Sequence, residues 1–298
     1  MRLLQLIALL ALLTAPAHAQ NQSMAADRCE SLAITGITSF IMDLSSFCAN
    51  SYTGNGQTWS NLIAAPADSN VQTYYDEFLG AGNTATATDP TFTGLSGHKG
   101  DYWSMDGGDY HSHTAGAAPG GFLGNLHCST VVASTCTSTP SWTMNVVFKY
   151  IDNGAVQWIA GTSNATGTAG LVLQVSSGDQ VQLRRNDGVV TTNTISTGLT
   201  LTGDVTYFLS MTYNPTDGTW KASINGATYS ATGTAAFAAI TIGPGTMSIG
   251  TTNKSTTTPL ASGSLLYEFS MMNAIASDAN LAAIATVYQA RTGLDLTP

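Results

Sequence analysis

Charged residues, and positively charged ones above all, are scarce in this sequence. Only 9% of the 298 residues are charged, and 9 basic residues stand against 18 acidic ones, a formal net charge of −9. Arg184 and Arg185 are the one adjacent basic pair, and on a strand neighbouring side chains point to opposite faces. Because nucleic acids and anionic lipid surfaces are bound through clustered positive charge, neither is an expected partner.

Long hydrophobic runs are missing apart from one at the start of the chain. "LLQLIALLALL" (residues 3–13) is well short of the ~20 residues that cross a bilayer. It follows Arg2 and precedes the small residues Ala17 and Ala19, the pattern of a signal peptide cleaved after Ala19. A retained membrane anchor is the alternative. We expect an exported protein, periplasmic, extracellular or surface-associated, with no membrane insertion once residues 1–19 are removed.

Cysteine is also scarce, and all four cysteines lie in the exported part. An even number in an oxidising compartment favours two disulfides. Of the three possible connectivities, the one that closes the shortest loops pairs Cys29 with Cys48 and Cys128 with Cys136, and it is the one we predict. A zinc site is the alternative, but the sequence has no C-x-x-C pair.

The sequence lacks the patterns of the common hydrolases. Its three glutamates, Glu30, Glu77 and Glu268, are isolated, whereas a glycosidase needs two carboxylates at one cleft. Asp76 and Glu77 are adjacent, so on a strand they point to opposite faces. The G-x-S-x-G elbow, the P-loop and G-x-G-x-x-G are absent as well. We therefore expect that the protein is not an enzyme, with a glycan-degrading enzyme as the least favoured of three functions.

Short strand patterns separated by turn signals fill the chain from about residue 140. Residues 142–150 alternate apolar and polar side chains with a period of two. Turn sequences follow at 152–154, 176–179, 186–188, 214–218 and 225–226. Asn-Gly and Asp-Gly accept the positive φ of tight hairpins. The spacing predicts an all-β fold, a two-sheet antiparallel jelly-roll sandwich.

One helix is predicted, near the C-terminus. Ser277 is its expected N-cap, Asp278 falls in its first turn, and Gly293 ends it. Apolar side chains recur at helical spacing at Leu281, Ile284, Ala285 and Tyr288. Such an amphipathic helix is expected to pack against a sheet.

The order of these patterns resembles the laminin-G-like, concanavalin A-like domains of bacterial and phage proteins. "SYTGNGQTWSNL" (51–62) is similar to their Y-x-G-x-G-x-x-W-x-D-L segment, with Asn61 in place of the usual aspartate. The resemblance continues in "ITSFIMDLSS", "DPTFTG…YWSMDGGDY" (whose turn is one residue shorter), "YFLSMTYNPTDGTWKASING" and the closing strands and helix. It spans about 36–296 and implies a jelly roll that commonly binds glycans, often with calcium. We divide the chain into a signal peptide (1–19), an N-terminal extension (20–35) and one domain (36–298).

Acidic residues in a tight turn are the candidate metal ligands. Asp106 and Asp109 flank two glycines, where their oxygens would converge on calcium, the one cofactor suggested. Further ligands would come from other loops, around Asp43, Asp76 or Asp152. The alternative is that both carboxylates bind backbone amides of their own turn.

The residues that follow this turn suggest a second metal hypothesis. Asp109, His111 and His113 alternate along an expected strand, an arrangement that suits a transition metal. The favoured alternative is an exposed strand edge that leads into a polar loop.

Aromatic residues are the remaining candidates for ligand binding, since sugar sites use exposed rings as stacking platforms. The candidates are Tyr52, Trp59, Tyr74, Tyr75, Tyr110 and Trp158. Trp59, Trp103 and Trp142 occupy positions where the resemblance implies core residues, so burial competes with stacking. We predict a secreted, non-catalytic recognition or adhesion protein whose partner is a glycan or another surface polymer. The alternative is a structural subunit or decoration of a virion, tail or cell-surface assembly, which would self-assemble or bind a surface or virion protein.

Overall fold

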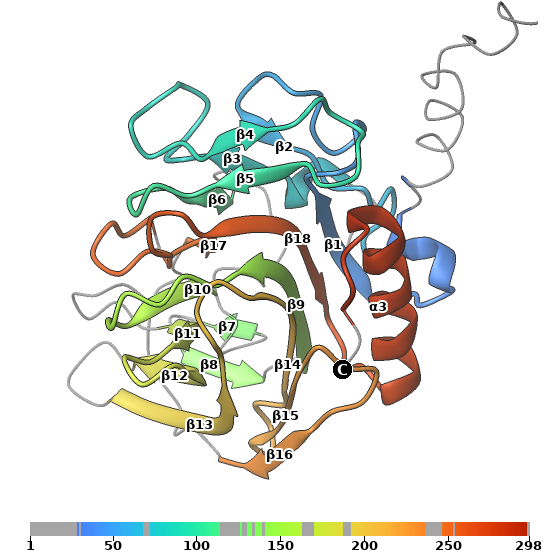
Figure 1. Ribbon diagram of the computed structural model, residues 1–298. Helices are drawn as coiled ribbons and strands as arrows, with labels where there is room; N and C mark the ends of the chain where they lie inside the picture. Colours follow the sequence, from blue (N-terminus) through green and yellow to red (C-terminus); the bar gives the residue numbers. More distant parts are fainter. Residues whose placement is uncertain are drawn as a thin grey trace, which may run out of the picture.

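The computed structural model describes residues 29, 31–67, 72–113, 126, 130–132, 135–138, 141–162, 170–186, 192–235, 246–252 and 254–296. Two antiparallel sheets pack face to face, and one α-helix lies against the outside of the first (Figure 1). The predicted β-sandwich is confirmed. The predicted signal peptide lies outside the described residues, and within them no helix has the length and apolar character to cross a membrane.

The first sheet, here sheet A, is built around the long strands β9 and β18. Its order is β16 (Ala231–Thr234), β15 (Thr219–Ile224), β14 (Thr206–Tyr213), β9 (Trp142–Lys149), β18 (Leu265–Met272), β5 (Tyr102–Ser104) and β4 (Thr91–Thr93), with β1 (Phe40–Ser45) also paired to β18. Along β9 the alternate residues Trp142, Met144 and Val146 enter the core, as the period of two predicts.

The second sheet, sheet B, contains the hairpin whose turn is predicted at 176–179. Its order is β13 (Thr192–Thr200), β12 (Gln180–Asn186), β11 (Gly170–Val175), β10 (Gln157–Gly161), β17 (Ser248–Ile249), β6 (His111–His113), β3 (Glu77–Leu79) and β2 (Thr58–Trp59). Asp179 takes a φ of 61° in the turn between β11 and β12, where the sequence signals a hairpin. A separate hairpin joins β7 (Thr130–Val132) to β8 (Thr135–Ser138).

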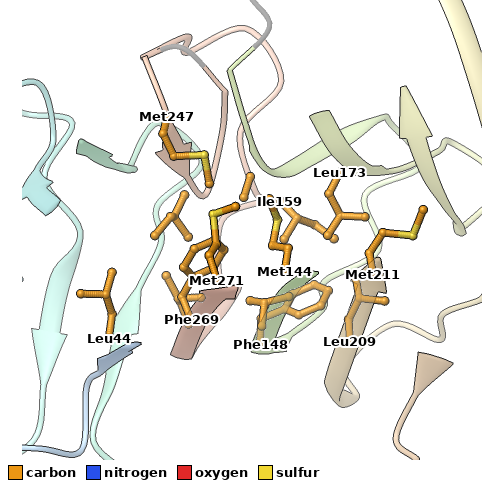
Figure 2. Packing of buried hydrophobic residues seen from close by; sticks show 14 of the residues in the cluster. Leu44, Met144, Phe148, Ile159, Leu173, Leu209, Met211, Met247, Phe269 and Met271 are labelled. Atoms are coloured by element: carbon orange, nitrogen blue, oxygen red, sulfur yellow. The ribbon is translucent and has the colours of Figure 1, made fainter. Parts of the chain in front are cut away.

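The core fills the space between the two sheets. Figure 2 shows it at close range, with side chains of sheet A facing those of sheet B: Met144, Met211 and Met271 on one side, and Ile159, Leu173 and Met247 on the other. Methionine is unbranched and flexible, so it fills the irregular gaps between layers. Trp220 of β15 packs at one margin of this core and is 9% exposed.

The helix α3 (Asp278–Thr292) covers the outer face of sheet A. Ser277 caps it in a capping box with Asn280, and Gly293 ends it with a φ of 74°, as predicted. Its apolar side packs with residues of β9, β14 and β18 in a second cluster that includes Val147, Phe208, Met272, Leu281, Ile284 and Tyr288. The short 3-10 turn η1 (Leu32–Thr35) belongs to the same cluster through Leu32, although the predicted domain begins only at residue 36.

Candidate functional site

Five of the six aromatic side chains proposed as stacking platforms are buried. Their exposed fractions are 0% for Trp59 and Tyr75, 3% for Tyr110, 4% for Trp158 and 5% for Tyr52. A buried ring cannot stack on a sugar that arrives from solvent, so these five residues lack the exposure that the prediction requires. Tyr74 lies in η2 (Gln72–Tyr75), and its side chain is outside the described part of the structure.

The competing expectation of core tryptophans is met. Trp59, Trp103 and Trp142 are all 0% exposed. The Trp103 ring contacts Tyr52 and Trp59, with centroid distances of 4.5 and 5.7 Å. These landmark aromatics therefore hold the two sheets together at the end where β2, β5 and β6 face one another.

The acidic turn at Asp106 and Asp109 binds its own backbone. The Gly108 amide donates to Asp106 Oδ1, and the Asp106 amide donates to Asp109 Oδ2, both at 2.9 Å. Burial, aided by the neighbouring Asp106 carboxyl, raises the pKa of Asp109 to about 7. Among the residues described, no three His, Cys, Asp or Glu side chains are grouped as metal ligands. Calcium binding at this turn stays a prediction.

The histidines after this turn do not lie on an exposed edge, so that expectation is wrong. Strand β6 is internal to sheet B, between β17 and β3, and His111 and His113 are 0% and 9% exposed. His113 Nδ1 lies 3.4 Å from Oε1 of the fully buried Glu77, its cross-strand partner. His111 packs between Trp59 and Trp103, and burial lowers its pKa to about 3. This cluster is part of the core, and the transition-metal hypothesis finds no third ligand grouped with the two imidazoles in the described structure.

Hydrogen-bonding side chains gather on the outer face of β11, β12 and β13, and all but Gln174, which is 4% exposed, are at least partly exposed. The period of two sends the apolar residues of these strands inward, Leu173, Val181, Leu183 and Ile195 among them. The alternate residues face outward, and we call this set the glutamine face: Gln174, Gln180, Gln182, Arg184, Thr194 and Ser196. Arg185, adjacent to Arg184, is only 3% exposed, so the two arginines take opposite sides as expected.

The glutamines of this face are held in fixed orientations by cross-strand contacts. Gln174, Gln182 and Ser196 are consecutive partners across the three strands. Gln174 Nε2 donates to Gln182 Oε1 at 2.9 Å, and Ser196 Oγ donates to Gln180 Oε1 at 2.8 Å. Gln180 and Gln182 thus use their carbonyl oxygens within the face. Their NH2 groups, with two N–H donors each, have no partner among the described residues.

A second set of unused polar atoms borders the glutamine face. Trp158 is the cross-strand partner of Gln174, and its backbone amide donates to the Thr258 carbonyl at 2.9 Å. The indole Nε1 of Trp158, Oε1 of Gln174 and Oγ1 of Thr258 are all buried without a hydrogen bond. Buried polar groups are normally satisfied by protein or water.

The sequence matches no family model and no curated protein. Several solved structures are similar in fold. One is domain 4 of AbnA, a GH43 extracellular arabinanase from Geobacillus stearothermophilus, which was solved in complex with arabinotriose. The alignment covers 83% of this chain and 98% of that domain, with a TM-score of 0.50 and 13% sequence identity. At that identity the similarity shows the fold alone, a β-sandwich.

Two further structures align less well. The CBM40 of Ruminococcus gnavus IT-sialidase, bound to α2,3-sialyllactose, matches 49% of this chain and 83% of its own, with a TM-score of 0.40 and 16% identity. Trypanosoma rangeli sialidase matches 88% of this chain and 34% of its own, with a TM-score of 0.49 and 11% identity.

Proposed function

We propose that this protein is an exported, non-catalytic recognition protein that binds glycans through the glutamine face. The observation that carries the proposal is the state of Gln180 and Gln182, whose carbonyl oxygens are held by Ser196 and Gln174 while their NH2 groups have no described partner. Amide donors that are fixed before binding lose little conformational entropy when a ligand hydroxyl accepts from them.

The chemistry of the face suits a polyhydroxylated ligand. The exposed hydroxyl of Thr194 can donate and accept, as sugar hydroxyls do, and the exposed Ser196 oxygen, whose proton is donated to Gln180, can accept. No carboxylate belongs to the set, so the face has no charge that would repel an acidic sugar or attract a basic partner. The arabinanase domain of similar fold was solved with an oligosaccharide, which is in keeping with this class of ligand.

The positions of the glutamates support binding without catalysis. Glu77 and Glu268 are the described glutamates, and both are 0% exposed. Glu77 pairs with His113 inside the sandwich, and Glu268 pairs with Arg291 beneath α3. A glycosidase places two carboxyl groups on either side of a bond in an open cleft, which neither glutamate can do from these positions.

A glycan array probed with the purified protein tests the proposal, followed by titration of the glycans that bind. Gln180→Ala combined with Gln182→Ala is expected to weaken binding at least about tenfold, since each lost hydrogen bond is worth ~1 kcal/mol and 1.4 kcal/mol is tenfold in affinity. Gln289→Ala, a partly exposed glutamine on α3, is the matched control and should bind as wild type does.

Two results would overturn the proposal. One is unchanged affinity in the double variant. The other is an array without any binding, and ordered self-assembly of the same sample in electron micrographs would then favour the structural alternative.

A further inference from the structure

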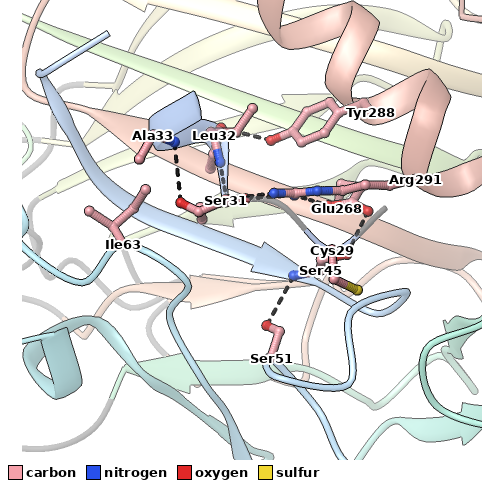
Figure 3. Close-up of polar contacts among 12 residues, drawn as sticks. Cys29, Ser31, Leu32, Ala33, Ser45, Ser51, Ile63, Glu268, Tyr288 and Arg291 are labelled. Atoms are coloured by element: carbon pink, nitrogen blue, oxygen red, sulfur yellow. Dashed lines mark hydrogen bonds and ion pairs between the residues drawn. The ribbon is translucent and has the colours of Figure 1, made fainter. Parts of the chain in front are cut away.

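Three ionisable side chains meet beneath the helix without access to water. Arg291 of α3, Asp43 of β1 and Glu268 of β18 are each 0% exposed, and we call them the Arg291 triad. Figure 3 shows Arg291 and Glu268 of this set together with Leu32 and Cys29. The guanidinium binds both oxygens of Asp43 at 2.8 Å and Oε2 of Glu268 at 3.0 Å. Buried ions are tolerated only when their remaining hydrogen-bonding positions are also filled.

The N-terminal segment fills one of those positions. The Leu32 amide donates to Asp43 Oδ2 at 2.8 Å, and the Leu32 side chain is 0% exposed in the cluster that α3 forms with sheet A. Residues 31–36 therefore act as a cover over the Arg291 triad. If the cover lifts, Asp43 loses a donor and water reaches the buried charges.

A pair of cysteines joins this cover to the end of β1. Cys29 precedes the cover, and Cys48 follows β1 at 0% exposure. Cys29 Sγ donates to the carbonyl oxygen of Phe47, the residue before Cys48, at 3.7 Å. Both cysteines are free thiols in this structure. Cys29 is only partly buried, so it is the thiol that a reagent from solvent reaches first.

We propose that Cys29 and Cys48 form a redox clasp, in which oxidation to a disulfide fastens the N-terminal cover over the Arg291 triad and reduction frees it. The arrangement favours Cys29 as the attacking thiol. The neighbouring Cys48 thiol lowers the pKa of Cys29, and the positive charge of Arg291 acts in the same direction.

The oxidant is a low-molecular-weight or enzyme-borne disulfide, such as the glutathione disulfide of an oxidising compartment. Cys29 gives its proton to solvent, attacks one sulfur of the oxidant and forms a mixed disulfide, and the departing thiolate takes up a proton. Cys48 then attacks the Cys29 sulfur, its proton passing to the second leaving thiolate. The protein loses two electrons and two protons, and the oxidant becomes two thiols.

The clasp makes a prediction that an ordinary surface disulfide does not. Closing the link restricts the opening of residues 29–36, so the Leu32 amide should exchange its hydrogen more slowly in the oxidised protein, by about tenfold or more. The slowing of Leu32 amide exchange on oxidation should depend on the Arg291 triad. In Asp43→Asn, which cannot form the ion pair, the Leu32 amide loses its carboxylate acceptor and the oxidised and reduced forms should differ less.

The test uses the mature chain, reduced and then incubated with glutathione disulfide. Peptide mass spectrometry without reductant should find Cys29 linked to Cys48, and hydrogen exchange of the peptide that contains Leu32 should slow on oxidation. Cys128→Ser with Cys136→Ser is the matched control and should leave both results unchanged. Cys48→Ser should abolish the slowing while the reduced variant stays folded by circular dichroism.

A folded protein in which Cys29 stays free or pairs with Cys128 or Cys136 would overturn the proposal. Equal Leu32 exchange in the linked and reduced forms would also overturn it. Neither outcome bears on glycan binding, because the glutamine face belongs to sheet B and the clasp lies on the outer side of sheet A.

Discussion

Arg291→Met is the substitution whose effect the structure specifies most closely. It removes the one positive charge that contacts Asp43 and Glu268 among the described residues, and it leaves both carboxylates buried at 0% exposure. Breaking a buried ion pair from one side costs ~3–5 kcal/mol, because the remaining charge has lost both its partner and its water. Against a total stability of ~5–15 kcal/mol, this loss should lower Tm by ~6–20 °C for a chain of this size.

The loss should also depend on pH. Burial raises the pKa of Glu268 to about 8, above its unfolded value of 4.5, even with Arg291 in place. The folded state therefore holds a proton that the unfolded state releases, so this group destabilises the fold progressively as pH rises from 4.5 to 8. Without the guanidinium the folded pKa rises further. The deficit of the variant is thus expected to be larger at pH 8 than at pH 5.

Urea denaturation followed by circular dichroism at pH 5 and pH 8 measures both effects. Lys149→Met is the matched control, because it breaks the Lys149–Asp204 pair, an ion pair of similar length (2.8 Å) whose carboxylate is 82% exposed. The triple variant Asp43→Asn, Glu268→Gln, Arg291→Met should recover much of the loss, since it leaves no uncompensated charge. Equal losses for Arg291→Met and Lys149→Met, or a deficit that does not change with pH, would refute the reasoning.

Three further substitutions test the sandwich itself. In His111→Phe the decline of Tm between pH 7 and pH 5 should become shallower. Burial lowers the pKa of His111 to about 3, so below pH 6.5 the unfolded chain binds a proton that the folded protein does not bind. The stability of wild type therefore falls by up to ~1.4 kcal/mol per pH unit in this range, and the variant lacks this loss. Gly161→Ala should lower the free energy of unfolding by ~1–3 kcal/mol in chemical denaturation, because the new Cβ would lie 2.3 Å from the Leu171 carbonyl oxygen. In the control Gly178→Ala the nearest atom is 3.9 Å from the new Cβ, so the free energy of unfolding should change by less than ~0.5 kcal/mol. Ser277→Ala should lower stability by ~1 kcal/mol in thermal melts, because Ser277 Oγ accepts from the Asn280 amide at the start of α3.

Local features of the fold were predictable because their causes are local. The alternation along 142–150, the positive φ at Asp179 and the caps at Ser277 and Gly293 depend on neighbouring residues only. The alternation of residues along β12 predicts which of its side chains face inward and which face outward for the same reason.

The placement of the candidate site was less predictable, because it depends on which layers meet. Trp59 and Tyr75 look like surface aromatics until the opposite sheet covers them. The contact of Glu77 with His113 requires the register of β3 against β6, which no local pattern encodes. The same holds for Arg291 and Asp43, which are 248 residues apart in the chain.

The burial of all five tryptophans determines the intrinsic fluorescence of the protein. Their exposed fractions range from 0% to 9%, so each indole is surrounded by protein and not by water. Native emission should be blue-shifted and hardly quenched by acrylamide, and unfolding should shift it strongly to the red. A ligand on the glutamine face would change none of this, since Trp158 beside it is covered. Intrinsic fluorescence should therefore report unfolding but not the proposed glycan binding, which calorimetry or a labelled ligand would detect.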